Sequence, residues 1–110
     1  MTFWRRCRLE TADKGHRLEI DLIIKSGKVA YGRAYFGVWR DTGDEKQVWP
    51  LMFLADESAV DYGSDFGDGK ARYGSMALHG QTMHVDAGFT YSDRTGTYEL
   101  KAAECCDLTD

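Results

Sequence analysis

The sequence predicts an all-β domain: a single antiparallel sheet of six to seven strands, joined by tight hairpins and curled into a small barrel or sandwich. Aromatic residues make up 13% of the chain, which contains 12 glycines but only one proline. This composition favours strands and tight turns. Apolar residues also recur at every second position in several segments separated by turn-forming residues. The length of 110 residues suits one domain, so we expect residues 1–110 to fold as a unit.

Two strands are expected first, over residues 3–10 and 16–25. Phe3, Cys7 and Leu9 share one parity in the first segment, and residues 12–15 supply a turn. The second segment has the clearest period of two, the pattern of a half-buried strand. Its inward residues are Leu18, Ile20, Leu22 and Ile24.

A two-residue hairpin loop is predicted at Ser26-Gly27, where glycine supplies a positive φ. Unbroken pairing beyond it would join Ile24 to Val29, Leu22 to Tyr31 and Leu18 to Tyr35. The core face would then contain Val29, Tyr31 and Tyr35. It would also place Arg33 opposite Ile20, so we expect either a rim position for Arg33 or a bulge near Gly32.

The segment from residue 47 to 54 is apolar on both parities. We expect a strand there, while a short helix within residues 50–62 is the alternative, with Pro50 in its first turn. The set Val48, Met52 and Leu54 and the set Trp49, Leu51 and Phe53 cannot both face one core. The second set must be covered either by another part of the chain or by a second subunit. We predict a homodimer with Trp49, Leu51 or Phe53 at its interface.

The last strands are expected over residues 71–79, 82–91 and 97–102. Asp93 to Gly96 has the sequence of a type I turn with a bulge, which aligns Tyr91 with Tyr98. Met83, Val85, Ala87, Phe89 and Tyr91 would face one way in the preceding strand, and Tyr98, Leu100 and Ala102 would face inward in the final one.

Cys7, Cys105 and Cys106 form an odd set with two adjacent members, which is a poor disulfide framework. We expect three reduced thiols in a cytoplasmic protein. An alternative is that Cys7 meets one of the other two across adjacent terminal strands.

Charge is unevenly distributed along the chain. Residues 1–40 hold nine basic and four acidic residues, whereas residues 41–69 hold eight acidic residues and one lysine. An acidic segment with aromatic neighbours is suited to a protein partner with a basic surface. The predicted partner-binding residues are Trp39, Trp49, Asp56, Glu57, Asp61, Tyr62, Asp65, Phe66 and Asp68.

Features of enzymes and metal sites are weak in this sequence. Asp41-Thr42-Gly43 matches the catalytic tripeptide of retroviral-type aspartic proteases, but Arg40 and Asp44 on either side would disturb a dyad that shares one proton. His79 and His84 are expected to be polar surface residues beside a turn. The acids in residues 61–69 lack the spacing of a calcium-binding EF-hand loop. We therefore expect no catalytic residues, no metal and no cofactor.

The function predicted is that of a non-enzymatic binding protein that acts through protein–protein interaction, of the inhibitor, immunity or phage or mobile-element counter-defence type. A small barrel that binds an apolar ligand is one alternative. The other is a domain that binds single-stranded nucleic acid, suggested by basic residues among aromatic ones within residues 3–8 and 31–40 and opposed by the net charge of −4. No apolar run approaches the ~20 residues of a membrane span, so no membrane partner is expected.

Overall fold

The computed structural model describes residues 2–41, 48–54, 59–62, 72–93 and 96–108, and at 48–49, 59–62 and 72–73 it describes the backbone only. All regular elements within these ranges are β-strands, as the sequence predicts, and none is a helix. Six strands have six or more residues, and three shorter ones complete the sheet. They are β1 (Thr2–Thr11), β2 (His16–Lys25), β3 (Lys28–Val29), β4 (Tyr35–Asp41), β5 (Val48–Phe53), β6 (Ala59–Tyr62), β7 (Arg72–Ser75), β8 (Gly88–Asp93) and β9 (Gly96–Leu108).

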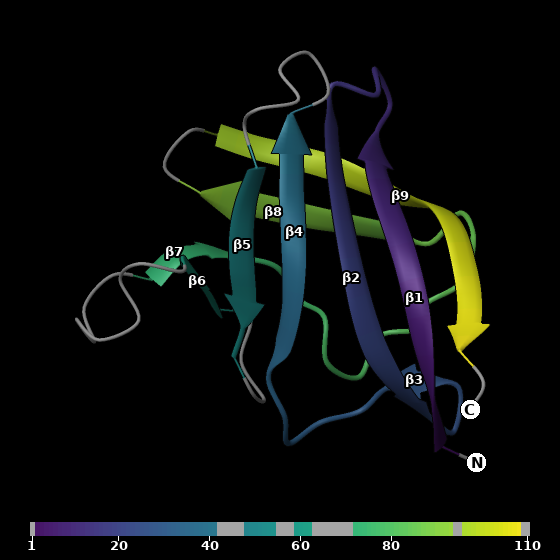
Figure 1. Cartoon of the computed structure of the whole chain (residues 1–110). Helices are drawn as coiled ribbons and strands as arrows, with labels where there is room; N and C mark the ends of the chain where they lie inside the picture. Colours follow the sequence, from purple (N-terminus) through teal and green to yellow (C-terminus); the bar gives the residue numbers. More distant parts are fainter. Residues whose placement is uncertain (1, 42–47, 55–58, 63–71, 94–95, 109–110) are drawn as a thin grey trace.

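The sheet curls until its two ends meet at β1. This strand pairs antiparallel with β2 on one side and with β9 on the other. The remaining ladders run in the order β9–β8–β7–β6–β5–β4–β2, with β3 attached to the end of β2. In Figure 1, β5, β4, β2 and β1 form the near wall, while β8 crosses behind them and β9 bends from the far wall to the side of β1. The predicted curled antiparallel sheet is therefore confirmed, in a barrel-like form.

The core fills the inside of the curled sheet. Each inward residue of β2 is at most 2% exposed, which confirms the alternation read from the sequence. Full burial of a leucine or isoleucine side chain stabilises the fold by about 1.5–3 kcal/mol. The core residues are Cys7, Leu9, Leu18, Ile20, Leu22, Ile24, Val29, Tyr35, Trp39, Leu51, Phe53, Met76, Leu78, Met83, Phe89, Tyr91, Leu100 and Ala102.

The pairing beyond the first hairpin differs from the prediction. Ile24 pairs with Val29 as expected, but β3 ends there and the chain bends away before β4 begins at Tyr35. Gly32 has a φ of +82°, and the Tyr35 hydroxyl donates a 2.8 Å hydrogen bond to the Ala30 carbonyl across this bend. Tyr31 is therefore 67% exposed instead of lying in the core.

The bend also moves the register of β4 along β2. Leu18 pairs with Trp39 and Ile20 with Gly37, so the expected pairs of Leu22 with Tyr31 and Leu18 with Tyr35 are wrong. The shift is four residues, an even number, and it therefore leaves Tyr35 on the core face.

The inward and outward sets of β5 are also the reverse of the prediction. Leu51 and Phe53 are each 1% exposed and belong to the core, so they are not available to a dimer interface. Their position follows from pairing, because Phe53 lies opposite Tyr35 and Leu51 opposite Gly37. The backbone of Trp49 pairs with that of Trp39, but its side chain lies outside the described residues.

Residues 76–87 connect β7 to β8 and cover one end of the curled sheet. The strands expected over 71–79 and 82–91 shrink to β7 and β8, and the segment between them is irregular. Met76, Leu78 and Met83 are nonetheless buried. Backbone hydrogen bonds join this segment to Val29, which accepts from the Gly80 amide and donates to the Gln81 carbonyl.

Candidate functional site

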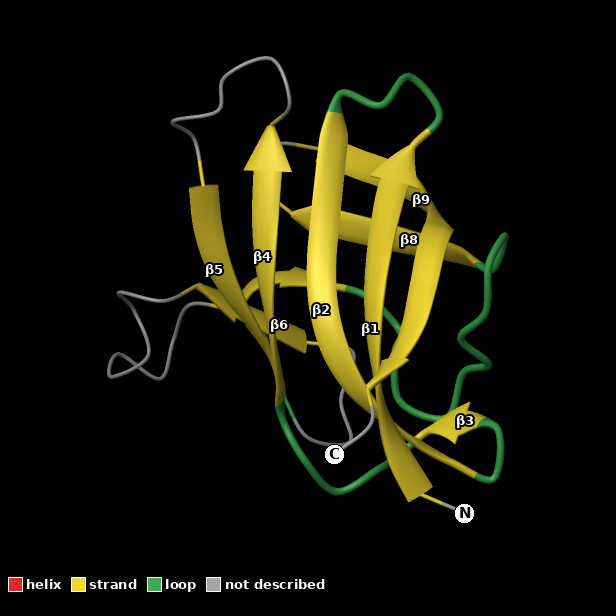
Figure 2. Ribbon diagram, turned by 45° about the vertical axis from the view of Figure 1, so that its right-hand side comes forward, coloured by secondary structure: helices red, strands yellow, loops and turns green. Residues whose placement is uncertain are grey.

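An accessible apolar surface on the described part of the near wall lies on the outer face of β4 and β5. Alternation in β4 turns Tyr35, Gly37 and Trp39 inward and Phe36 and Val38 outward. Pairing with β5 places Met52 opposite Phe36 and Pro50 opposite Val38. We call Phe36, Val38, Pro50 and Met52 the outer patch. Figure 2 shows β4 and β5 side by side with no described segment in front of them.

Phe36 is the dominant member of the outer patch, with 64% of its surface exposed. Pro50 is also exposed, and Val38 and Met52 are half-buried. Isolated apolar residues are common on protein surfaces, whereas large contiguous apolar patches often mark interaction sites. The arrangement therefore points to a binding surface.

A hollow of about 360 Å³ lies beside Phe36 on this wall. It opens where the ladder between β2 and β4 stops at the pair Ile20–Gly37. A larger residue at position 37 would be strained, because a Cβ atom would lie 3.0 Å from Leu18 Cδ1 and 3.1 Å from the Glu19 carbonyl oxygen. The hollow is lined by Arg6, Glu19, Ile20, Asp21, Phe36, Gly37, Val38 and Pro50.

Charges of both signs surround the outer patch. Arg6 donates two hydrogen bonds to Asp21, at 2.8 and 3.0 Å, and this carboxylate raises the pKa of the guanidinium. Arg17 and Arg40 lie directly opposite each other, and Glu19 reduces their repulsion by forming ion pairs with both, at 3.7 and 3.6 Å. Exposed pairs of this kind contribute little to the stability of the fold.

Trp39, expected at the partner-binding surface, lies in the interior. It is 7% exposed and packs against Tyr91 and Tyr98 at ring-centroid distances of 4.8 and 5.3 Å. It therefore cannot act as a surface anchor in this structure. The expectation is wrong because Trp39 pairs with Leu18, an inward residue of β2, and therefore also faces inward.

The other predicted partner-binding residues fall mainly outside the described part of the chain. Asp56, Glu57, Asp65, Phe66 and Asp68 lie outside it, as does the side chain of Trp49. The backbones of Asp61 and Tyr62 pair with Met52 and Leu51 in the ladder between β5 and β6, and their side chains are not described. The acidic segment therefore remains a prediction.

Polar residues gather at the end of the sheet where β2 begins. His16 Nδ1 and Asp41 Oδ1 lie 2.5 Å apart, and the Trp39 indole donates to the same oxygen at 3.3 Å. The Tyr98 ring meets the imidazole edge-on at 4.7 Å. Asp41 thus holds His16 in one orientation. Thr42 and Gly43, the rest of the protease-like tripeptide, lie outside the described residues.

The two remaining histidines are not equivalent. His79 is buried, contrary to expectation, and its Nε2 donates a 2.8 Å hydrogen bond to the Arg33 carbonyl. His84 is exposed. Among the residues that the structure describes, no three His, Cys, Asp or Glu side chains are grouped as a metal site would require.

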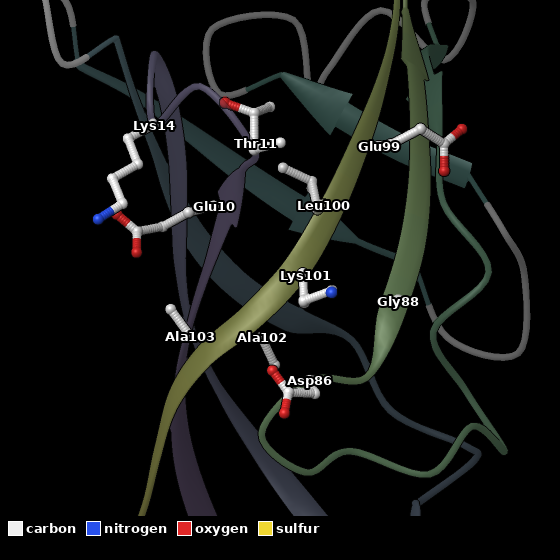
Figure 3. Close-up of a pocket in the computed structure, with 11 residues that line it drawn as sticks. Glu10, Thr11, Lys14, Asp86, Gly88, Glu99, Leu100, Lys101, Ala102 and Ala103 are labelled. Carbon is white, nitrogen blue, oxygen red and sulfur yellow. The ribbon is translucent and has the colours of Figure 1, made fainter.

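A second hollow, of about 460 Å³, crosses β9 on the outer surface. Figure 3 shows Glu10 and Lys14 on one side of β9, with Lys101 and Asp86 on the other. The absence of a side chain at Gly88 helps to open it. Its lining mixes two lysines with three carboxylates, a combination that selects no single ligand class.

Comparisons with protein-family models, with curated proteins and with solved structures found no match. The described residues include no helical segment long and apolar enough to cross a membrane. The residues that the sequence did not single out as a site are Phe36, Val38, Pro50 and Met52. The available signal was the period of two in residues 35–39, which placed Phe36 and Val38 opposite the core face.

Proposed function

We propose that this protein is a non-enzymatic binding domain that presents the outer patch to another protein. The observation that carries the proposal is the 64% exposure of Phe36, in a contiguous apolar row beside a hollow. Protein interfaces are commonly built around an aromatic anchor with a polar rim. Inhibitors, immunity proteins and phage counter-defence proteins are the proposed functional types, and the acidic segment is a further contact for a partner with a basic surface.

A protein is favoured over single-stranded nucleic acid because the arginines of β1 are already neutralised. Arg5 binds Asp107 at 2.6 Å, Arg6 binds Asp21, and Arg8 lies 3.3 Å from Glu104. Nucleic-acid affinity depends mainly on cations that are free to meet phosphates. The exposed ring of Trp4, on the same strand, is already covered by Arg33 at 5.4 Å from the ring centroid.

A second copy of this chain is the other candidate occupant of the outer patch. Because Leu51 and Phe53 face the core, the dimer that we propose would use the outward residues Pro50 and Met52 instead. A rim that holds Arg40 beside Glu19 is compatible with a two-fold interface, in which each charge meets its opposite. A cytoplasmic location is also part of the proposal, because three cysteines with two adjacent in the sequence are a poor disulfide framework.

Site-specific photo-crosslinking tests the proposed surface. A benzophenone amino acid replaces Phe36 in one variant and Tyr31 in the other, a control with the similar exposure of 67%. In extracts of the organism that encodes the protein, we expect one discrete adduct with a different protein at position 36 and none at position 31. An adduct of twice the chain mass would favour the homodimer instead. Equal adducts at both positions, or none, would contradict a binding role for the outer patch.

A further inference from the structure

We propose that Cys7 and Cys105 are a paired thiol site that forms an intramolecular disulfide when the protein meets a disulfide-type oxidant. The inference is independent of the proposed binding function. It rests on the register of β1 and β9, on the surroundings of the two sulfur atoms and on the position of Cys106.

Cys7 and Cys105 lie directly opposite each other in the ladder between β1 and β9. Leu9 pairs with Ala102 and Arg8 with Glu104, so one extra residue of β9, Ala103, is inserted between these pairs. Without this bulge Glu104 would lie opposite Cys7. The bulge therefore brings Cys105 to the inward side of the strand, where it packs against the core.

The spacing of opposite residues in an antiparallel ladder suits a disulfide. Such residues have Cα atoms about 4.5–5.5 Å apart, within the roughly 4.4–6.8 Å that disulfides span. The two thiols also lie close enough to interact. Bond formation therefore requires little movement of the backbone.

Cys106 is not an alternative partner within the same strand. Successive side chains of a strand point to opposite faces, and Cys106 is exposed whereas Cys105 is half-buried. Its thiol instead donates a weak 3.8 Å hydrogen bond to the Asp107 carbonyl. The chain thus supplies a matched control cysteine one residue away.

The two thiols have different roles in the reaction. Burial, followed by the hydrogen bond with Cys105, raises the pKa of Cys7 well above the ordinary value of a thiol, although Arg5 opposes this. Cys7 is 1% exposed, so an oxidant reaches Cys105 first. Cys105 is therefore the attacking thiol, and Cys7 resolves the intermediate.

The exchange balances with oxidised glutathione as the oxidant. The Cys105 sulfur, as thiolate, attacks one sulfur of glutathione disulfide, forms a mixed disulfide and releases one glutathione thiolate. The Cys7 sulfur then gives up its proton, bonds to the Cys105 sulfur and releases the second glutathione. Two protons end on the two glutathione molecules, and two electrons pass from the cysteine pair to the glutathione disulfide.

Mass spectrometry after equilibration with glutathione buffers of increasing oxidation tests the inference. We expect the folded protein to become lighter by two hydrogen atoms, its free thiols to fall from three to one, and a peptide linking Cys7 to Cys105 to appear. Dithiothreitol should reverse all three changes. Since the link joins the two terminal strands, Tm should rise in the oxidised form.

Three variants make the result decisive. Cys106→Ser should retain the intramolecular disulfide, whereas Cys105→Ser and Cys7→Ser should lose it completely. If the buried Cys7→Ser variant does not fold, the half-buried Cys105→Ser variant gives the same comparison. A link between Cys105 and Cys106, dimers joined only through Cys106, or a Cys7 thiol that remains free under oxidising conditions would overturn the inference.

Discussion

Phe36 lies directly opposite Met52 in the ladder between β4 and β5, and both side chains point away from the core. This pair and its neighbours, Val38 and Pro50, form the outer patch on which the proposed function depends. Its position is fixed by the inward packing of Tyr35 and Phe53, which form the preceding pair of the same ladder. The same strand register therefore places the outer patch on one face of the sheet and the core on the other.

The two faces of β5 should respond differently to truncation. Leu51→Ala leaves a cavity in the core and should lower the free energy of unfolding by about 2–5 kcal/mol. Met52→Ala, on the half-buried outer face, should cost about 1 kcal/mol or less. Urea unfolding of both variants measures the difference. A larger loss for Met52→Ala would mean that the faces of β5 are assigned in the wrong sense.

Gly37 is required by the close approach of β4 to β2. In Gly37→Ala the new methyl group would press on Leu18 and on the Glu19 carbonyl, and the strain should cost about 1–3 kcal/mol. Gly88→Ala is the matched control, because the nearest atom to its new methyl group would be the Leu100 carbonyl oxygen at 4.0 Å. We expect that variant to change stability by no more than about 0.5 kcal/mol. Equal Tm values for the two variants would contradict this packing.

Stability should decline in acid partly through Asp107. The hydrogen bond from Arg5 holds the pKa of this carboxyl below its ordinary value in the folded protein. The stabilisation is therefore present above the unfolded pKa and is lost as the pH falls through the folded pKa. Thermal unfolding from neutral to acidic pH should show Asp107→Asn less stable than the wild type at neutral pH, with the gap closing in acid. A gap that does not depend on pH would exclude this ion pair as its cause.

The acidic segment is tested by kinetics. Changing Asp61, Asp65 and Asp68 to lysine together should slow association with a basic partner and flatten its dependence on salt. Stopped-flow measurements at several ionic strengths give both quantities. An association rate that does not change would show that these three residues do not steer the partner.

The features that could be predicted from the sequence are local. The period of two in residues 18–24 identifies the inward face of β2, and Ser26-Gly27 sets the pair Ile24–Val29. The pair Tyr91–Tyr98 likewise follows from the turn at residues 93–96, and the structure confirms it. In each case the turn lies only a few residues from the pair that it aligns.

Long-range register could not be predicted in the same way. Residues 48–53 are apolar on both parities, so only pairing with Tyr35 and Gly37 decides which of their side chains face the core. The outer patch depends on that decision. The sequence allows Cys7 to meet either Cys105 or Cys106 across the terminal strands. The pairing with Cys105 depends on the bulge at Ala103, and the local sequence pattern gives no sign of that bulge.

The central claim is that the outer patch binds a protein, and the affinity for the crosslinked partner tests it most directly. Isothermal titration should compare the wild type with Phe36→Ala and with Tyr31→Ala, two aromatic truncations of similar exposure. An anchor residue at an interface contributes about 2 kcal/mol or more, so Phe36→Ala should raise Kd by roughly 30-fold or more. Tyr31→Ala should leave Kd nearly unchanged. If Phe36→Ala binds as tightly as the wild type, the outer patch is not the binding surface.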